Sequence, residues 1–190
     1  MEALQAGDPP YVGAYRLMGR LGAGGMGRVF LGVSPGGRNV AVKLMLPEHS
    51  ADKEFRQRFA REVAAARQVG GFHTAPVVDA DPDADPPWMV TAYIPGPSLD
   101  AVVRSAGPLD PSAMRALGAG LAEGLAAVHA AGLVHRDLKP SNGLLREFCE
   151  GGYAGWRITR LRRRGKLARP YVCRLVISIL LTLPSMAAEL

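Results

Sequence analysis

The sequence predicts an α+β domain in which strands come first, followed by a helix, further strands and a second helix. Three observations predict it: a glycine-rich turn between two apolar strand-like stretches, an amphipathic helix after a third stretch, and a well-capped helix after two more. The 190 residues suit one domain, or one domain followed by a tail. With 48% hydrophobic residues the chain can form a packed core, so disorder of the whole chain is excluded.

The strands are predicted from short apolar runs bounded by turn residues. They lie at residues 15–21, 28–33, 39–44, 75–80 and 88–94. The turn SPGG at residues 34–37 joins the second strand to the third, and the acidic, proline-rich residues 81–87 separate the last two.

Two helices are predicted from apolar residues that recur on one face. The first covers residues 52–69, where Phe55, Phe59, Val63 and Ala66 follow one another at spacings of four, four and three, and Gly70-Gly71 ends it. The second begins with Asp110 as cap and Pro111 in the first turn, and it ends at Gly132. Its apolar face consists of Leu117, Leu121, Leu125 and Val128.

The formal net charge of +6 is unevenly distributed. Residues 1–142 hold 14 Lys and Arg and 14 Asp and Glu, whereas residues 143–190 hold 9 Lys and Arg and 3 Asp and Glu. Both cysteines lie in the second part and are too few for a disulfide framework. We therefore expect a domain at residues 11–145 and a basic and apolar tail at residues 146–190.

No segment predicts export or membrane insertion. The first ten residues lack the basic and apolar pattern of a signal peptide. The longest strongly apolar stretch, residues 175–183, has nine residues, whereas a membrane-spanning helix needs roughly 17–25. We expect a soluble, cytoplasmic protein.

The first motif is the segment GAGGMGRV at residues 22–29, which fits the pattern G-x-G-x-x-G-x-V. Glycines let a backbone approach a phosphate closely and direct its N–H groups at the oxygens. A dinucleotide-binding fingerprint would open a helix and need an acidic residue about 20 positions on. Here a strand follows, and Lys43 stands at about that distance. A plain flexible hairpin is the other interpretation of this motif taken alone.

The second motif pairs a lysine with a glutamate. Lys43 is a cation on the otherwise apolar strand at residues 39–44, and an inward-facing lysine needs an anion because an unpaired buried charge is costly. Glu62 lies on the following helix, near its apolar edge. A Lys43–Glu62 pair would direct the ammonium at nucleotide phosphates. The alternative for Glu62 is an ordinary surface pair with Arg58, four residues earlier.

The third motif, HRDLKPSN at residues 135–142, places Asp137, Lys139 and Asn142 within one short loop after a helix. A carboxylate can accept a hydroxyl proton, a lysine can steady a transferred phosphoryl group, and an asparagine carbonyl can hold a metal ion. The alternative is a polar turn.

These motifs, in this order, resemble the first half of a protein kinase domain, most closely the bacterial serine/threonine kinases of actinobacterial type. The resemblance covers residues 11–145. It implies a small lobe made of an antiparallel sheet and one helix, together with the first helices of the large lobe. It also implies phosphoryl transfer from ATP, with magnesium, to a Ser or Thr hydroxyl of a protein substrate.

The resemblance assigns roles to individual residues. Lys43 would contact the α- and β-phosphates and pair with Glu62, Asp137 would be the catalytic base, and Lys139 would support the transferred phosphate. Asn142 would bind one magnesium ion. The glycines that would cover the phosphates are Gly22, Gly24 and Gly27.

The resemblance also places the adenine. Thr91 would stand at the back of its pocket, and the Ala92 carbonyl and Ile94 N–H would bind its edge. The ring would lie between Leu21, Val29, Ala41 and Leu144, which could equally be plain core residues.

The sequence departs from the family after Leu145. The family has an Asp-Phe-Gly segment whose aspartate holds magnesium, but no aspartate follows Asp137, and Glu147 and Glu150 are too close to the loop to replace it. We therefore expect a truncated kinase with little or no activity. A non-catalytic nucleotide-binding or interaction module is the alternative.

The tail admits three interpretations: unselected sequence, a basic segment that binds nucleic acid or an anionic membrane, or a short replacement for the missing lobe. The family buries the leucine face at Leu117, Leu121 and Leu125 under large-lobe helices. We therefore expect self-association or poor solubility of residues 1–145 alone.

Overall fold

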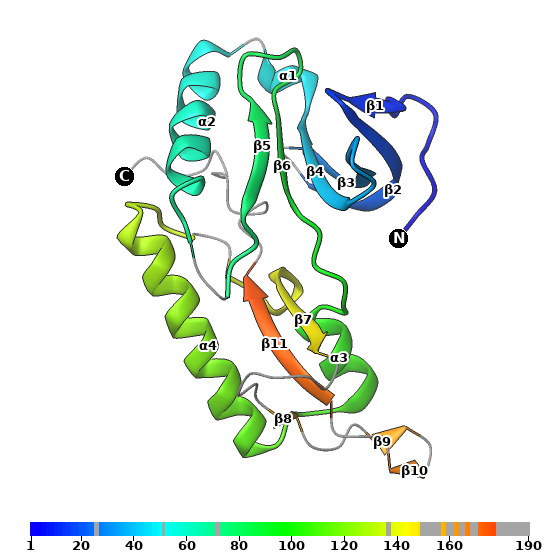
Figure 1. The fold of residues 1–190 in the computed structure, drawn as a ribbon, viewed down its shortest axis with the longest axis vertical. Helices are drawn as coiled ribbons and strands as arrows, with labels where there is room; N and C mark the ends of the chain where they lie inside the picture. Colours follow the sequence, from blue (N-terminus) through cyan, green and yellow to red (C-terminus); the bar gives the residue numbers. More distant parts are fainter. Residues whose placement is uncertain are drawn as a thin grey trace. The chain divides into compact units, whose positions relative to one another are not determined.

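The computed structural model describes residues 1–24, 27–50, 52–70, 73–135 and 138–148, and the strands at 157–158, 162–163, 166–167 and 171–177 (Figure 1). The chain divides into two compact units. The first comprises Met1–Val69 and Pro76–Tyr93, and the second comprises Gly70–Ala75 and the described residues from Ile94 onward.

The first unit contains a six-stranded antiparallel sheet with the strand order β1-β2-β3-β4-β6-β5. Its strands are β1 (Tyr11–Val12), β2 (Tyr15–Gly24), β3 (Gly27–Val33), β4 (Asn39–Met45), β5 (Val77–Asp81) and β6 (Trp88–Ala92). All five predicted strands are therefore present, and β1 is an addition that the sequence did not indicate. The α+β fold class predicted from the sequence is confirmed.

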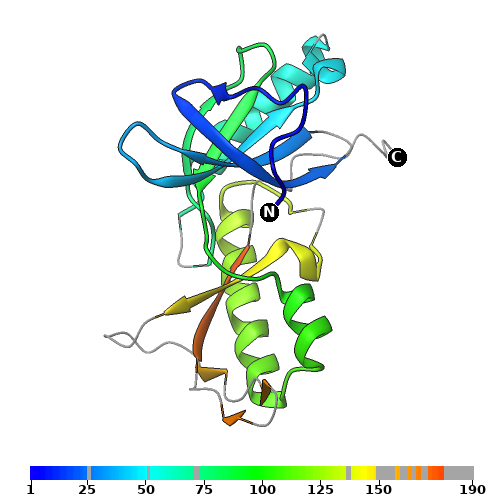
Figure 2. The same cartoon turned by 90° about the vertical axis from the view of Figure 1, so that its right-hand side faces the viewer.

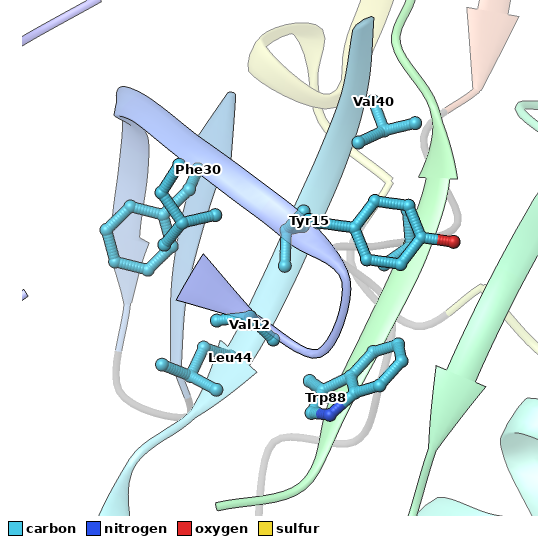
Figure 3. Packing of buried hydrophobic residues seen from close by; sticks show 9 residues of the cluster. Val12, Tyr15, Phe30, Val40, Leu44 and Trp88 are labelled. Atoms are coloured by element: carbon cyan, nitrogen blue, oxygen red, sulfur yellow. The ribbon is translucent and has the colours of Figure 1, made fainter. Parts of the chain in front are cut away.

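One face of this sheet carries the core, because side chains alternate between the two faces along a strand. The even-numbered residues Phe30, Val42, Leu44, Trp88 and Val90 point to the same face and are buried there. Tyr15 packs edge-on against Trp88, with ring centroids 6.0 Å apart (Figure 3). The odd-numbered residues of β3, β4 and β6 are consequently left for the opposite face.

Two helices follow β4, namely α1 (Pro47–Ser50) and α2 (Lys53–Ala66). The Asp52 carboxylate caps α2 by accepting hydrogen bonds from the amides of Glu54 and Phe55. The four residues of the predicted apolar face are the buried ones. Figure 1 shows α2 running beside β5.

The second unit contains α3 (Leu99–Ala106), α4 (Pro111–Ala130), the 3-10 turn η1 (Pro140–Asn142) and the strand β7 (Gly143–Phe148). The Asp110 carboxylate caps α4 as predicted, accepting from the amides of Ser112 and Ala113. Leu117 and Leu121 are half-buried against a small cluster formed by Val102 of α3 and Leu145 of β7. No local pattern predicts the contact between Val102 and Leu145, and their cluster covers part of the leucine face within the described chain.

Part of the predicted tail forms strands. β11 (Tyr171–Ile177) pairs with β7 and with β8 (Arg157–Ile158), while β9 (Arg162–Arg163) pairs with β10 (Lys166–Leu167). The backbone of β11 runs alongside α4 (Figure 2). β7 itself spans the expected boundary after residue 145, and that boundary stays a prediction. Among the described residues, no helix combines the length and apolarity needed to cross a membrane.

Candidate functional site

The sheet face opposite the core gathers several of the predicted nucleotide-binding residues. Lys43 of β4 stands directly across from Val29 of β3 and from Met89 of β6. Ala41 stands directly across from Thr91. Residues opposite each other in an antiparallel pair share a face, so these side chains form one surface.

The glycine motif forms the β2–β3 hairpin instead of opening a helix. Gly22 pairs with Val29 and Gly24 with Gly27, and we call residues 20–24 and 27–29 the glycine hairpin. A β-carbon placed on Gly22 or Gly24 would meet no atom within 4 Å. These two positions are therefore open to an approaching group, and Leu21 beside them is exposed.

Lys43 is buried, with only 5% of its surface exposed. Its neighbours on the sheet are Val29 and Met89, so the lysine stands in an apolar stretch of the sheet. Glu62 lies half-buried on α2, next to the buried Val63. The pairing of Lys43 with Glu62 stays a prediction.

Thr91 presents a buried hydroxyl on the same face. It is 1% exposed, and its Oγ1 has no hydrogen-bond partner among the described residues. Leaving such a hydroxyl unsatisfied costs about 1–3 kcal/mol, so this atom can gain from a polar ligand. The backbone amide of Ala92 donates to the Pro76 carbonyl at 3.0 Å. The carbonyl of Ala92 is the group that is predicted to face adenine.

In the second unit, the structure brings Ile94 and Leu144 together. Both pack with the buried Ala75, and the Leu145 amide donates to the Pro97 carbonyl at 2.9 Å. The segment that follows the predicted adenine-binding residues is thereby attached to the strand that follows the HRDLKPSN motif. Two residues expected to contact the adenine ring are therefore neighbours.

The catalytic-loop motif is described in part. Asn142 is buried, with 3% of its surface exposed. Its backbone N–H donates to the Lys139 carbonyl at 2.9 Å, and its side-chain Oδ1 accepts from the Ser141 hydroxyl at 3.5 Å. Lys139 is exposed. His135 is buried at the start of the motif. Asp137, the predicted base, lies outside the described residues, so its role stays a prediction.

Two residues with evident structural roles were missed from the sequence. The Arg56 guanidinium on α2 donates to the carbonyls of Pro82, Asp83 and Ala84 at 3.3, 3.3 and 2.8 Å, which fixes the β5–β6 turn to the helix. Asp8 contacts both strands of the glycine hairpin. Neither role could be found from local pattern, because the contacts with the hairpin and with the β5–β6 turn join residues 12 or more positions apart along the chain.

The fold and these motifs define a protein kinase domain. Residues 15–152 match the family model described as the protein kinase domain, and the chain belongs to this family. The family predicted from the sequence is therefore confirmed.

The chain is similar to kinases from several bacteria. It is 68% identical over 145 residues to the probable serine/threonine-protein kinase PkwA of Thermomonospora curvata, covering 76% of this chain and 20% of that protein. It is 54% identical over 147 residues to the serine/threonine-protein kinase AfsK of Streptomyces griseus, covering 77% of this chain and 18% of that protein. The chain thus spans about a fifth of the length of these relatives.

Solved structures of protein kinase domains also match the fold of this chain. The crystal structure of the Mycobacterium tuberculosis PknI kinase domain matches with a TM-score of 0.66 and 25% identity, covering 96% of this chain and 64% of that domain. The antiparallel small-lobe sheet with one long helix, expected from the motifs, agrees with this likeness.

Proposed function

We propose that this chain is the ATP-binding part of a serine/threonine protein kinase, whose reaction moves the γ-phosphoryl group of ATP to a Ser or Thr hydroxyl. The observation that carries the proposal is the surface with buried Lys43 between Val29 and Met89, beside the glycine hairpin, in which Gly22 and Gly24 are open. A buried cation near glycine backbone that no side chain obstructs suits a polyphosphate. The cytoplasmic location predicted from the sequence belongs to the same proposal, since ATP is a cytoplasmic substrate.

The described residues fit ATP. Gly22 and Gly24 offer backbone at positions without side-chain obstruction, and Lys43 offers a positive charge for the phosphates. The buried Thr91 hydroxyl lacks a partner among the described residues and is available to the adenine end. Ala41, directly across from Thr91, supplies apolar surface for a ring.

The transfer itself would depend on the loop at residues 135–142. In the proposed roles, Asp137 accepts the proton of the substrate hydroxyl while the oxygen of that hydroxyl bonds to the γ-phosphorus, and the bond between the γ-phosphorus and the ADP oxygen breaks. Lys139 steadies the transferred group, and Asn142 holds magnesium through its side-chain carbonyl. Magnesium would neutralise charge on the phosphates.

A second function is favoured by one observation. No aspartate follows Asp137, so the second magnesium ligand that the family uses is missing from this sequence. A sequence without this aspartate would suit a chain that binds ATP without turnover and acts as a nucleotide-dependent interaction module. Self-association through α4, and binding of the basic tail to nucleic acid or anionic membranes, stay predictions alongside it.

The test compares the full chain with Lys43→Ala and Asp137→Asn. Titration with a fluorescent ATP analogue should show binding by the full chain and by Asp137→Asn, and loss of binding in Lys43→Ala. Incubation with labelled ATP then separates the two functions. Label incorporation lost in both variants supports a kinase, and binding without label supports the module. If the full chain binds no nucleotide, both functions are wrong.

A further inference from the structure

Asp8 lies outside every motif of the sequence, yet its side chain is fully buried. The Asp8 carboxylate accepts two hydrogen bonds from the Arg20 guanidinium, at 2.7 Å from Nε and 2.6 Å from Nη2. It also accepts from the backbone N–H of Gln5 at 2.8 Å. Paired nitrogen donors of this kind form strong, directional contacts with a carboxylate.

Arg20 is two residues before Gly22 on β2, so the first contact fixes the entering strand of the glycine hairpin. The same carboxylate lies 3.6 Å from Nη1 of Arg28, which follows Gly27 on β3. One buried anion therefore reaches both strands of the hairpin, on either side of the glycines.

The segment that carries Asp8 is also fixed to β2 through its backbone. Glu2 and Arg20 exchange both backbone hydrogen bonds at 2.9 Å, and the Leu17 amide donates to the Pro10 carbonyl at 2.9 Å. The Gln5 side chain accepts from Arg20 at 2.6 Å. Residues 2–10 thus lie along the same edge of β2 that pairs with β1, and Asp8 is held in place from both ends of that segment.

Charge adds to this geometry. The hydrogen bond from Arg20 lowers the pKa of Asp8. Burial acts in the opposite direction and raises this pKa, whereas the hydrogen bond from the Gln5 N–H and the charges of the two guanidinium groups lower it further. The carboxylate is therefore ionised at neutral pH. Without it, Arg20 and Arg28 would present two positive charges to each other on neighbouring strands.

We infer that Asp8 is a positioning residue for the glycine hairpin, and that its buried carboxylate holds β2 and β3 in the arrangement that receives nucleotide phosphates. That the hairpin binds nucleotide phosphates rests on the proposed function. The contacts of Asp8 with the two strands of the hairpin do not depend on that function. Asp8 itself touches no reacting group, and it acts through Arg20 and Arg28.

The test uses the full chain with Asp8→Asn, which keeps the side-chain shape and removes the charge. Hydrogen exchange measured by mass spectrometry should become roughly tenfold faster in peptides covering residues 20–24 and 27–29, while β4 and β6 keep their protection. The affinity for a fluorescent ATP analogue should fall by a similar factor. Asp100→Asn is the matched control, because it removes the exposed pair with Arg104 and should change neither measurement.

Two results would overturn the inference: hairpin exchange equal to wild type in Asp8→Asn, or faster exchange spread evenly over the whole sheet, which would mean a general stabilising role. If Asp8→Asn does not fold, Arg28→Gln removes only the 3.6 Å contact and leaves the Arg20 pair intact. It should still speed exchange in the hairpin, and unchanged exchange would refute the inference. A full chain that binds no nucleotide removes the proposed function, while the exchange result still decides the role of Asp8.

Discussion

Gly27 lies so close to Leu44 that a β-carbon on Gly27 would stand 2.5 Å from the Leu44 carbonyl oxygen. That separation is shorter than non-bonded carbon and oxygen atoms tolerate, and the obstructing atom belongs to the backbone of β4. Gly27→Ala must therefore push β3 away from β4. We expect it to lower the free energy of unfolding by about 1–3 kcal/mol, measured by urea denaturation. A variant as stable as wild type would show that the strands separate freely here.

Gly22 and Gly24 should behave differently from Gly27, because a β-carbon at either position meets no atom within 4 Å. Gly22→Ala and Gly24→Ala should leave the free energy of unfolding within about 0.5 kcal/mol of wild type. If nucleotide phosphates approach this backbone, both variants should nevertheless bind the ATP analogue more weakly. Gly36→Ala, in the exposed turn before β4 and equally unobstructed, is the control for both measurements. Unchanged affinity in both loop variants would place the phosphates elsewhere.

Arg56 should contribute to stability through the β5–β6 turn. Its guanidinium also donates to the Ser50 carbonyl at 2.6 Å, so it joins the start of α2 to two other segments. Arg56→Ala leaves several carbonyls without a donor, and we expect a loss of about 1–3 kcal/mol in thermal or urea denaturation. Arg61→Ala, an exposed arginine of the same helix, should cost much less. Equal losses in the two variants would mean that the turn contacts contribute nothing.

Tyr15 should give the stability of the chain a pH dependence in the alkaline range. Burial, and then the hydrogen bond that its hydroxyl donates to Asp79 at 3.0 Å, raise the pKa of Tyr15. A raised pKa in the folded state means that the stabilisation is fully present below about pH 10 and is lost as the pH rises through the folded-state value.

The Tyr15→Phe variant makes that dependence measurable. Wild type should be the more stable protein near neutral pH, and its advantage over Tyr15→Phe should shrink as urea denaturation is repeated at increasing pH up to 11. Tyr11→Phe, at an exposed position, is the control, and its free energy of unfolding should change with pH in the same way as that of wild type. A constant difference between wild type and Tyr15→Phe across the range would contradict the prediction.

Local sequence signals were sufficient wherever the structure is determined by neighbours along the chain. Asp110 and Pro111 marked the start of α4, and the spacing from Phe55 to Ala66 marked the buried face of α2. The helix α3 was missed, although Ser98 caps it, because it has only eight residues and follows Pro-Gly-Pro. A short helix in such a setting depends on tertiary packing, here of Val102, more than on local pattern.

The candidate site likewise contains residues that the sequence identifies and contacts that it does not. The motif residues were recognisable because their types and order are specific. That Ala41, Lys43 and Thr91 share one face depends on the register between β4 and β6, which the sequence alone does not record. The contact of Asp8 with Arg20 and Arg28 depends on an N-terminal segment folding back along β2, and no periodicity in the sequence records that. The cluster around Val102 and Leu145 likewise joins two residues that lie 43 positions apart, so local pattern did not show which residues cover part of α4.

Leu145 provides a test of where the folded domain ends. It lies at the end of the expected domain, yet it is 2% exposed, packs with Val102, and its amide bonds to the Pro97 carbonyl. Leu145→Ala would leave a cavity beside α3 and α4, and we expect a loss of about 2–5 kcal/mol in urea denaturation. Leu138→Ala removes the same atoms from a side chain that is 47% exposed and should cost less than about 1 kcal/mol. If the two variants are equally stable, Leu145 lies outside the cooperative core, and the folded domain ends before this residue.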